Sequence, residues 1–321
     1  MFRRIFLLTL FCLFFSSIAL AADVNNAVMA EFEADSQKLT EVKSGSSSYE
    51  ADWNIMGISL KMKGTSDFNN GKKRLSHAFY KVTARLWGLP LASVKGESYS
   101  DDDSERNLTY TKEEKGGWEY QLTPKQGTPL ANLHSVSDLA DYKAVVKELA
   151  IKKDTAKERI YSFKIDGAKL GELCRAQMDE RADYDAYIDK KDDEKLTAKE
   201  QAEIIMANLG DADISLAFDK ESGYVKMFRG DFSEMMRAAL HALVDREPNK
   251  TADEKAKMHS LVNKSSLKIK ADLSNVNNVD EIIIPQEIID NATEKQDKQP
   301  PSRDSTVYAN NTSLPSRMIM R

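Results

Sequence analysis

The segment from Asp189 to Glu200, with the sequence DKKDDEKLTAKE, has residue types and spacing that come near those of a calcium site. It has the length of an EF-hand loop, acids at its first, fifth and twelfth positions, and helical sequence on both sides. Lys191, however, replaces the third ligand, and Glu194 replaces the glycine that lets such a loop wrap a cation. Thr197 and Glu200 also form a capping box, which explains that end without metal. We therefore expect a helix–loop–helix joint, with calcium binding as the weaker alternative.

Other residue types that carry chemistry are scattered. The sequence has no G-x-S-x-G elbow, no phosphate-binding loop and no H-x-x-x-H pair. The acidic residues are abundant, but no pair of them stands in an apolar setting that would shift a pKa, so we expect a solvated surface. The four histidines are His77, His134, His241 and His259. The sequence therefore predicts no catalytic residues, no metal site, no cofactor and no enzyme.

The N-terminal residues have the pattern of a removable secretory signal. Arg3 and Arg4 precede an apolar run over 5–15, and Ala19-Leu20-Ala21 matches the small-x-small pattern of a cleavage site. Because Ser16 and Ser17 interrupt the apolar run, an uncleaved membrane anchor is the weaker alternative. We predict cleavage near Ala21 and export to the periplasm, the cell envelope or the medium.

The cysteines and the net charge limit which modifications and partners the mature chain is expected to have. Cys12 does not create a lipidation signal, because Phe11 stands where a small residue is needed. Its removal leaves Cys174 as the single cysteine, so no disulfide can form within the mature chain. The 46 Lys and Arg residues include Arg3 and Arg4, which leaves 44 against 51 acidic residues and a net charge of −7. An acidic chain with no basic block is not expected to bind nucleic acid or anionic lipid headgroups.

The first half of the mature chain reads as one helix followed by strands. Val28, Phe32, Leu39 and Val42 have helical spacing, and alternating apolar residues begin at Tyr49. The alternation slips by one residue beside Gly57, which predicts a bulge or a sharp bend. The pattern of the following segments is typical of an antiparallel meander with one apolar face. These strand candidates are 74–87, 91–99, 105–113 and 117–123.

Helices and strands alternate in the second half. Helices are expected over 135–149, 169–208 (broken by an acidic segment) and 231–244, where Asp231 and Glu234 form a D-x-x-E capping box. Strands are expected over 159–165, 214–218, 224–228, 267–273 and 281–285. From Thr293 onward the chain is polar, and we expect a disordered tail.

Three stretches carry a resemblance to a known group of proteins. They are GDADI at 210–214, GYVKM at 223–227, and the ending over 273–285, which finishes at a proline. The chain resembles the LolA/LppX-like half-β-barrel lipoprotein-carrier superfamily, and most of all an uncharacterised branch of exported bacterial proteins. The resemblance implies an α+β fold: a strongly curved antiparallel half-barrel sheet with helices packed on its concave face. The expected division is 1–21 signal peptide, 22–292 half-barrel domain and 293–321 disordered tail.

The resemblance implies an apolar cavity between sheet and helices and brings no catalytic residues. Candidate cavity residues are Trp53, Ile58, Leu60, Met62, Phe79, Trp118, Tyr120, Leu216, Phe218, Met235, Met236, Leu240, Leu267 and Ile269. Methionine and aromatic side chains suit a cavity that adapts to several ligand shapes. The helix over 231–244, flanked by Gly230 and the polar stretch 246–251, is expected to act as a lid that gates the cavity mouth, with a fixed cover of the core as the alternative.

The expected function is an exported, non-enzymatic binder of a lipid or another apolar small molecule, acting as an envelope carrier or chaperone. The alternative is a structural or interaction module of the cell envelope whose core is filled and holds no ligand. Contact with a membrane surface agrees with either function, whereas integral insertion is not expected.

Overall fold

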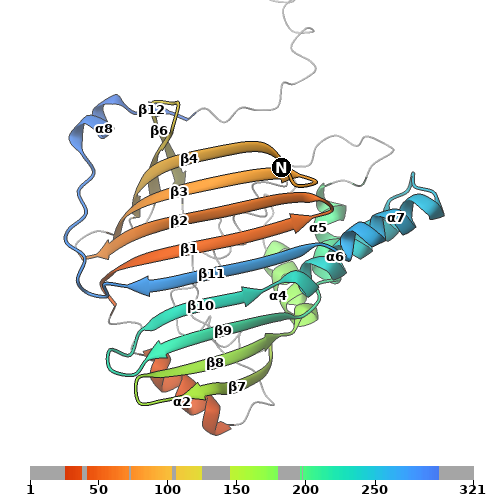
Figure 1. Cartoon of the computed structure of the whole chain (residues 1–321), viewed down its shortest axis with the longest axis horizontal. Coiled ribbons are helices and arrows are strands. Elements are labelled where there is room, and N and C mark those ends of the chain that lie inside the picture. Colours follow the sequence, from red (N-terminus) through yellow and green to blue (C-terminus); the bar gives the residue numbers. More distant parts are fainter. Residues whose placement is uncertain are drawn as a thin grey trace, which may run out of the picture.

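A computed structural model describes residues 26–37, 42–71, 74–102, 106–124, 145–179, 196 and 198–295 of the 321-residue chain. The described part is built on one 12-stranded sheet with the strand order β12-β6-β5-β4-β3-β2-β1-β11-β10-β9-β8-β7. Neighbouring strands are antiparallel except β12, which runs parallel to β6. The chain is therefore α+β, with one large, mostly antiparallel sheet and several helices (Figure 1).

The elements follow the expected order in part. The strands are β1 (Ser44–Ile55), β2 (Ile58–Asn70), β3 (Arg74–Leu86), β4 (Leu89–Asp102), β5 (Arg106–Glu113), β6 (Trp118–Pro124), β7 (Val146–Asp154), β8 (Glu158–Ile165), β9 (Ala212–Asp219), β10 (Val225–Asp231), β11 (Ser266–Ser274) and β12 (Thr293–Glu294). The helices are α2 (Asn26–Gln37), α4 (Gly167–Asp179), α5 (Ala198–Ala207), α6 (Ser233–Arg246), α7 (Ala252–Val262) and α8 (Gln286–Asn291). In the described ranges, no helix combines the length and apolar character needed to span a membrane.

The predicted bulge beside Gly57 is wrong, because the chain reverses there. Met56 and Gly57 form a two-residue hairpin turn with φ of 51° and 92°, and Ile55 pairs directly with Ile58. Residues that flank such a turn face the same side of the sheet. The apolar residues on both sides of the turn therefore share one face, although their alternation changes phase in the sequence.

The predicted helix over 135–149 is wrong in its last part. Residues 135–144 lie outside the described ranges, but β7 begins at Val146 and pairs with β8. The register of that pair shifts between Val146 and Glu148, and both Val146 and Leu149 are buried. A bulge thus places two apolar residues three positions apart on one side, which imitates the spacing of a helix.

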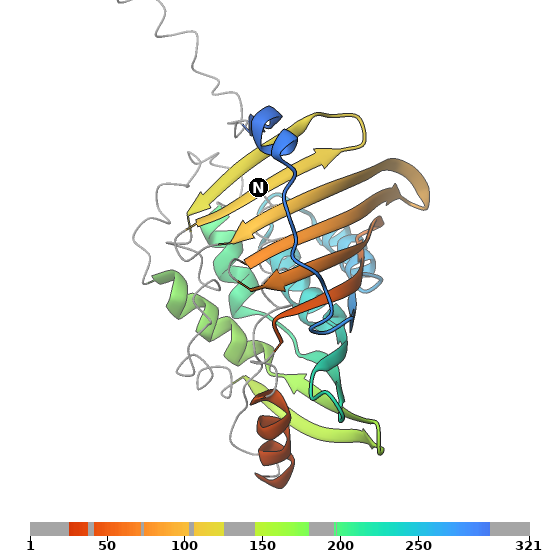
Figure 2. The same cartoon turned by 90° about the vertical axis from the view of Figure 1, so that its left-hand side faces the viewer.

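The predicted strand over 281–285 is an extended segment without strand pairing, followed by α8. The two elements form a strap that crosses strands of the sheet (Figure 2). Ile282 and Ile284 pack into a cluster that contains Ile288 of α8, while Ile283 between them is 74% exposed. The alternation therefore marks one buried side correctly, but that side contacts side chains rather than a neighbouring strand. Beyond it, Thr293 and Glu294 pair with β6, and 296–321 lie outside the described residues.

The capping box predicted for the helix over 231–244 is also wrong. The helix begins at Ser233 with Phe232 in the N-cap position, and the Asp231 carboxylate accepts a hydrogen bond from the Ser233 backbone N–H at 3.0 Å. A true capping box opens α7, where Thr251 and Glu254 satisfy each other's backbone N–H groups. The sequence predicts only a polar stretch at 246–251, so helix α7 was not among the predicted elements.

Candidate functional site

One row of directly paired residues crosses the sheet from β8 to β4. Its members are apolar side chains or glycine, so no polar side chain interrupts it. In order they are Phe163, Ile214, Gly230, Ile269, Ala51, Met62, Val82 and Val94. We call the face that carries this row the inner face and the opposite one the outer face. A continuous apolar row of this kind requires a cover along its whole length.

Burial along the row changes where β1 meets β2. Ile214 and Ile269 are 5% and 1% exposed, and Ala51 is 1% exposed, whereas Met62 and Val82 are only partly buried. Helix α6 contacts β9 and β11, which accounts for the cover on one side. The inner face thus has two parts. The closed half lies over β8, β9, β10, β11 and β1. The open half lies over β2, β3 and β4, and it includes Tyr49 of β1 at its border.

Helix α2 covers the closed half through Phe32. The Phe32 ring meets the rings of Tyr161 and Phe163 edge to face, with centroids 5.1 Å apart in both pairs. The Tyr161 hydroxyl donates to the Asp35 carboxylate at 2.8 Å, and burial together with Asp35 raises the pKa of Tyr161. Arg159 also binds Asp35 at 3.3 Å, so polar bonds at the rim hold the helix in place.

Helix α6 is fixed to the sheet at its start. The Phe232 N–H donates to the Leu267 carbonyl at 2.8 Å, and the Leu267 N–H donates to the Ser233 hydroxyl at 3.1 Å. Met235 and Met236 of the same helix are 8% and 7% exposed. The geometry favours a fixed cover over a lid, because opening would break both bonds and expose both methionines.

A second row gives the open half a flat aromatic surface. Tyr49, Gly64, Tyr80 and Gly96 are paired in that order on β1, β2, β3 and β4. A Cβ atom at Gly64 would overlap the Tyr49 ring, and one at Gly96 would overlap the Tyr80 ring. Each tyrosine therefore lies across the glycine on the next strand. Burial raises the pKa of both phenols, and the neighbouring Tyr80 raises that of Tyr49 further, so both stay neutral donors at ordinary pH.

The structure brings ten of the fourteen candidate cavity residues together on the inner face. Seven are buried in its core: Trp53, Leu216, Phe218, Met235, Met236, Leu267 and Ile269. Three are partly buried against that core: Leu60, Met62 and Leu240. The role of this set in a cavity remains a prediction. Tyr49, Val82 and Val94 were not among the candidates, although they lie within the alternating stretches that predicted the strands.

The other four candidates lie elsewhere. Ile58 is at the tip of the β1–β2 hairpin and is 46% exposed. Phe79 is on the outer face, as its pairing with Thr65 and Glu97 shows. Trp118 and Tyr120 also belong to the outer face, where they pack in the cluster that contains Tyr99, Tyr110 and Ile288. The alternation of a strand separates its two faces but does not say which one meets the helices.

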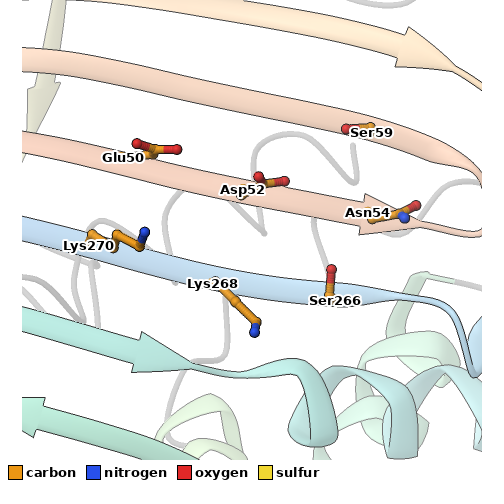
Figure 3. Close-up of a pocket in the computed structure, with 7 residues that line it drawn as sticks. All are labelled: Glu50, Asp52, Asn54, Ser59, Ser266, Lys268 and Lys270. Atoms are coloured by element: carbon orange, nitrogen blue, oxygen red, sulfur yellow. The ribbon is translucent and has the colours of Figure 1, made fainter. Parts of the chain in front are cut away.

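A polar groove runs over β1, β2 and β11 on the outer face (Figure 3). It is lined by Glu50, Asp52, Asn54, Ser59, Ser266, Lys268 and Lys270. Glu50 binds Lys61 at 2.5 Å and Lys63 at 3.1 Å, and these lysines lower the pKa of the Glu50 carboxyl. A carboxylate held ionised by two lysines is a poor general acid. The groove resembles a solvated face with paired charges.

The histidines that the sequence left scattered include one pair that meets in space. The Nδ1 atoms of His241 on α6 and His259 on α7 are 2.6 Å apart, and the Nε2 of His259 lies 2.9 Å from an Asp245 oxygen. The pair joins the two helices. Among the described residues, no group of three or more His, Cys, Asp or Glu side chains is placed to hold a metal ion. Residues 189–195 and Thr197 of the predicted loop lie outside those residues, and with them the predicted capping box at Thr197.

The fold is similar to that of LprF from Mycobacterium bovis. The similarity to this crystal structure covers 81% of this chain and 98% of that chain, with 12% sequence identity and a TM-score of 0.40. LprF is a member of the LolA/LppX-like group that the sequence resemblance named, and the similarity concerns the fold alone. No model of a known protein family matches the chain, and no curated protein matches it. These comparisons do not indicate a ligand, so a ligand can be inferred only from the side chains of this chain.

Proposed function

We propose that this chain is a non-enzymatic binder of a lipid or another apolar molecule, which it holds on the open half of the inner face. The single observation that carries the proposal is the change in burial along one uninterrupted apolar row, from Ile269 at 1% exposed to Met62, Val82 and Val94, which are partly exposed. A closed core would bury both halves of such a row equally. An apolar ligand over β2–β4 would complete the cover.

The side chains of the open half suit an elongated apolar ligand. Met62, Val82 and Val94 offer dispersion contacts without hydrogen-bond demands, and the methionine can adjust to different shapes. The flat rings of Tyr49 and Tyr80 add a wide contact surface, and their hydroxyls could bond an ester or carboxylate oxygen at one end of the ligand. The proposed ligand is thus an acyl chain with a polar end.

The shape of the sheet and the location of the protein that we propose are those expected from the sequence. The sheet would be a strongly curved half-barrel with helices on its concave face, in an exported protein cleaved near Ala21 and acting as a carrier or chaperone in the cell envelope. The paired ions of the outer face, such as Glu50 with Lys61, leave that face as the solvated side. Contact with a membrane would serve loading and release of the ligand.

A filled core without ligand is the second candidate, and a specific observation favours it. The closed half is well packed, with Tyr161, Phe218 and Ile269 at 0–1% exposed, and α6 is bonded to β11 at its start. In that case the open half would be a surface for a protein partner rather than for a ligand. The two functions therefore differ in what covers Met62, Val82 and Val94.

Mass spectrometry of an organic extract from the purified protein separates the two. We expect an apolar molecule in near-stoichiometric amount from the wild type, and its loss from Val82→Glu, because a carboxylate in the apolar row must remain hydrated. Ile283→Glu, which changes an exposed apolar residue of the strap, is the matched control and should keep the ligand. A clean extract from the wild type, together with probe binding that Val82→Glu leaves unchanged, would contradict the proposal.

A further inference from the structure

Two neighbouring hairpin tips carry an unusual share of exposed apolar side chains. The described ranges contain nine exposed large apolar residues, and five of them lie in the β1–β2 and β3–β4 tips. These five are Ile58 (46%), Leu86 (37%), Trp87 (63%), Leu89 (71%) and Leu91 (59%). We call this surface the apolar tip. An apolar patch of this kind on an otherwise charged protein marks a place of contact.

The two hairpins form one preformed unit. The Trp87 N–H donates to the Gly57 carbonyl at 2.9 Å, and a Cβ at Gly57 would lie 2.5 Å from the Trp87 ring. The Met56 N–H donates to the Ser265 hydroxyl at 3.0 Å, which ties the same turn to the end of α7. The apolar tip is thus fixed to the body of the protein and needs no ordering before it binds.

The turn itself does not account for a tryptophan at its tip. Trp87 and Gly88 form a two-residue turn with φ of 51° and 84°, a geometry in which Asn or Asp normally precedes glycine. A bulky residue at positive φ raises the energy of the backbone. The Trp87 ring packs on Gly57 of the neighbouring hairpin but is still 63% exposed, so most of its surface is available for a contact outside the protein.

The charged residues near the apolar tip indicate which kind of partner it contacts. Residues 82–94 include no acidic side chain and a single basic one, Arg85, in a protein with 51 acidic residues. Within the described part of the chain, Arg85 and Lys81 form no ion pair. Lys81 stands directly opposite Lys95 on the outer face. In a lipid monolayer, the phosphates lie directly above the acyl chains. The apolar tip and the neighbouring cations have the same arrangement, with apolar side chains at the end and positive charges behind them.

The edge of β4 disfavours a protein strand as the partner. Strand β4 pairs with β5 only from Gly96 onward, so residues 89–94 form an edge that no other described strand covers, and the β3–β4 hairpin extends beyond its neighbours (Figure 2). Pro90 removes a hydrogen-bond donor from that edge. Addition of a partner strand is therefore weakened, while burial of the side chains in lipid is not.

We infer that the apolar tip binds the surface of a lipid bilayer. Trp87, Leu89 and Leu91 enter the interface between headgroups and acyl chains, and Arg85 and Lys81 contact lipid phosphates. This inference uses residues other than those of the proposed ligand site, so either one can fail while the other holds. The contact would be peripheral. Its strength would depend on anionic lipid through the local cations Arg85 and Lys81, although the net charge of the whole mature chain predicts no such attraction.

Sedimentation with vesicles tests the inference. Wild-type protein is expected to bind vesicles of phosphatidylcholine and phosphatidylglycerol in equal amounts, and Leu89→Asp should weaken partitioning by about tenfold or more, the cost of losing one buried leucine. Ile283→Asp is the matched control, because Ile283 is 74% and Leu89 71% exposed, and it should bind as the wild type does. Arg85→Gln should weaken binding to these vesicles and leave binding to pure phosphatidylcholine unchanged.

Three results would overturn the inference. The first is wild-type protein that stays in solution with both kinds of vesicle. The second is an equal loss of binding in Leu89→Asp and Ile283→Asp. The third is a wild type that sediments as a dimer without vesicles while Leu89→Asp is a monomer, since the apolar tip would then serve a second copy of the chain. Equal melting temperatures of all variants are required, and all three mutated side chains are exposed enough to expect them.

Discussion

The ring of Tyr49 lies across Gly64, the residue directly opposite it on the neighbouring strand β2. A side chain at Gly64 would meet both this ring and, at 2.5 Å, the backbone carbonyl of Phe79. We predict that Gly64→Ala lowers the free energy of unfolding by about 1–3 kcal/mol, because the neighbours must shift. Gly117→Ala is the control: its Cβ meets nothing within 4 Å, so a change within about 0.5 kcal/mol is expected in urea unfolding. Equal effects of the two substitutions would contradict the placement of Tyr49.

Two members of the same apolar row should respond differently to truncation. Ile269 is 1% exposed in the closed half, and Ile269→Ala is expected to cost about 2–5 kcal/mol because it leaves a cavity. Val82 lies in the open half and is partly exposed, so Val82→Ala should cost less than about 1 kcal/mol while it weakens binding of a fluorescent apolar probe. Unfolding and probe titrations of both variants give the comparison. A large loss of stability in Val82→Ala would mean that both halves are closed core.

The fixed position of α6 predicts a large effect of a charge at Met236. The side chain is 7% exposed, so Met236→Asp places a carboxylate where no partner compensates its lost hydration, and several kcal/mol of stability should be lost. Calorimetry would show a sharply lower melting temperature. If the helix were a mobile lid, the melting temperature would stay near that of the wild type and only uptake of the probe would change.

Glu158 gives a prediction for pH. Hydrogen bonds from Lys153 at 2.7 Å and Lys226 at 2.6 Å lower its pKa from 4.5 to about 2. Because the pKa is lower in the folded than in the unfolded state, the ionised carboxylate stabilises the fold above about pH 4.5, and this contribution is lost as the pH falls towards 2. The difference in urea midpoint between wild type and Glu158→Gln should therefore shrink from pH 7 to pH 2. Glu172→Gln, at an exposed site on α4, should show no such trend. A difference that is constant over this range would contradict the assignment.

Local patterns in the sequence were sufficient for most strands of the sheet. The segment predicted as 74–87 is β3 (Arg74–Leu86), and 105–113 is β5 (Arg106–Glu113), because alternation and turn residues are local signals. The hairpin at Met56 and Gly57 was not predicted, since methionine is not a residue that marks a two-residue turn. The helical spacing of Val146 and Leu149 came from a bulge, which depends on the partner strand.

The candidate site was predicted only in part, for a related reason. Trp53 and Ile269 alternate correctly and are buried on the inner face. Trp118 and Tyr120 alternate equally well, but the strap that carries Ile288 packs on their side of the sheet. Which face of a strand meets a helix or a strap is decided by contacts between segments distant in the sequence, and a linear pattern does not contain them.

Photo-crosslinking with a diazirine-bearing fatty acid, mapped to single residues by mass spectrometry, tests the central claim most directly. Adjacent residues of a strand face opposite sides, so the position of each adduct reports the face that holds the ligand. We predict adducts on Met62, Val82 and Val94 of the open half, and their loss in Val82→Glu. Adducts confined to outer-face residues such as Phe79 and Leu122, or labelling that Val82→Glu leaves unchanged, would contradict an apolar ligand on the inner face.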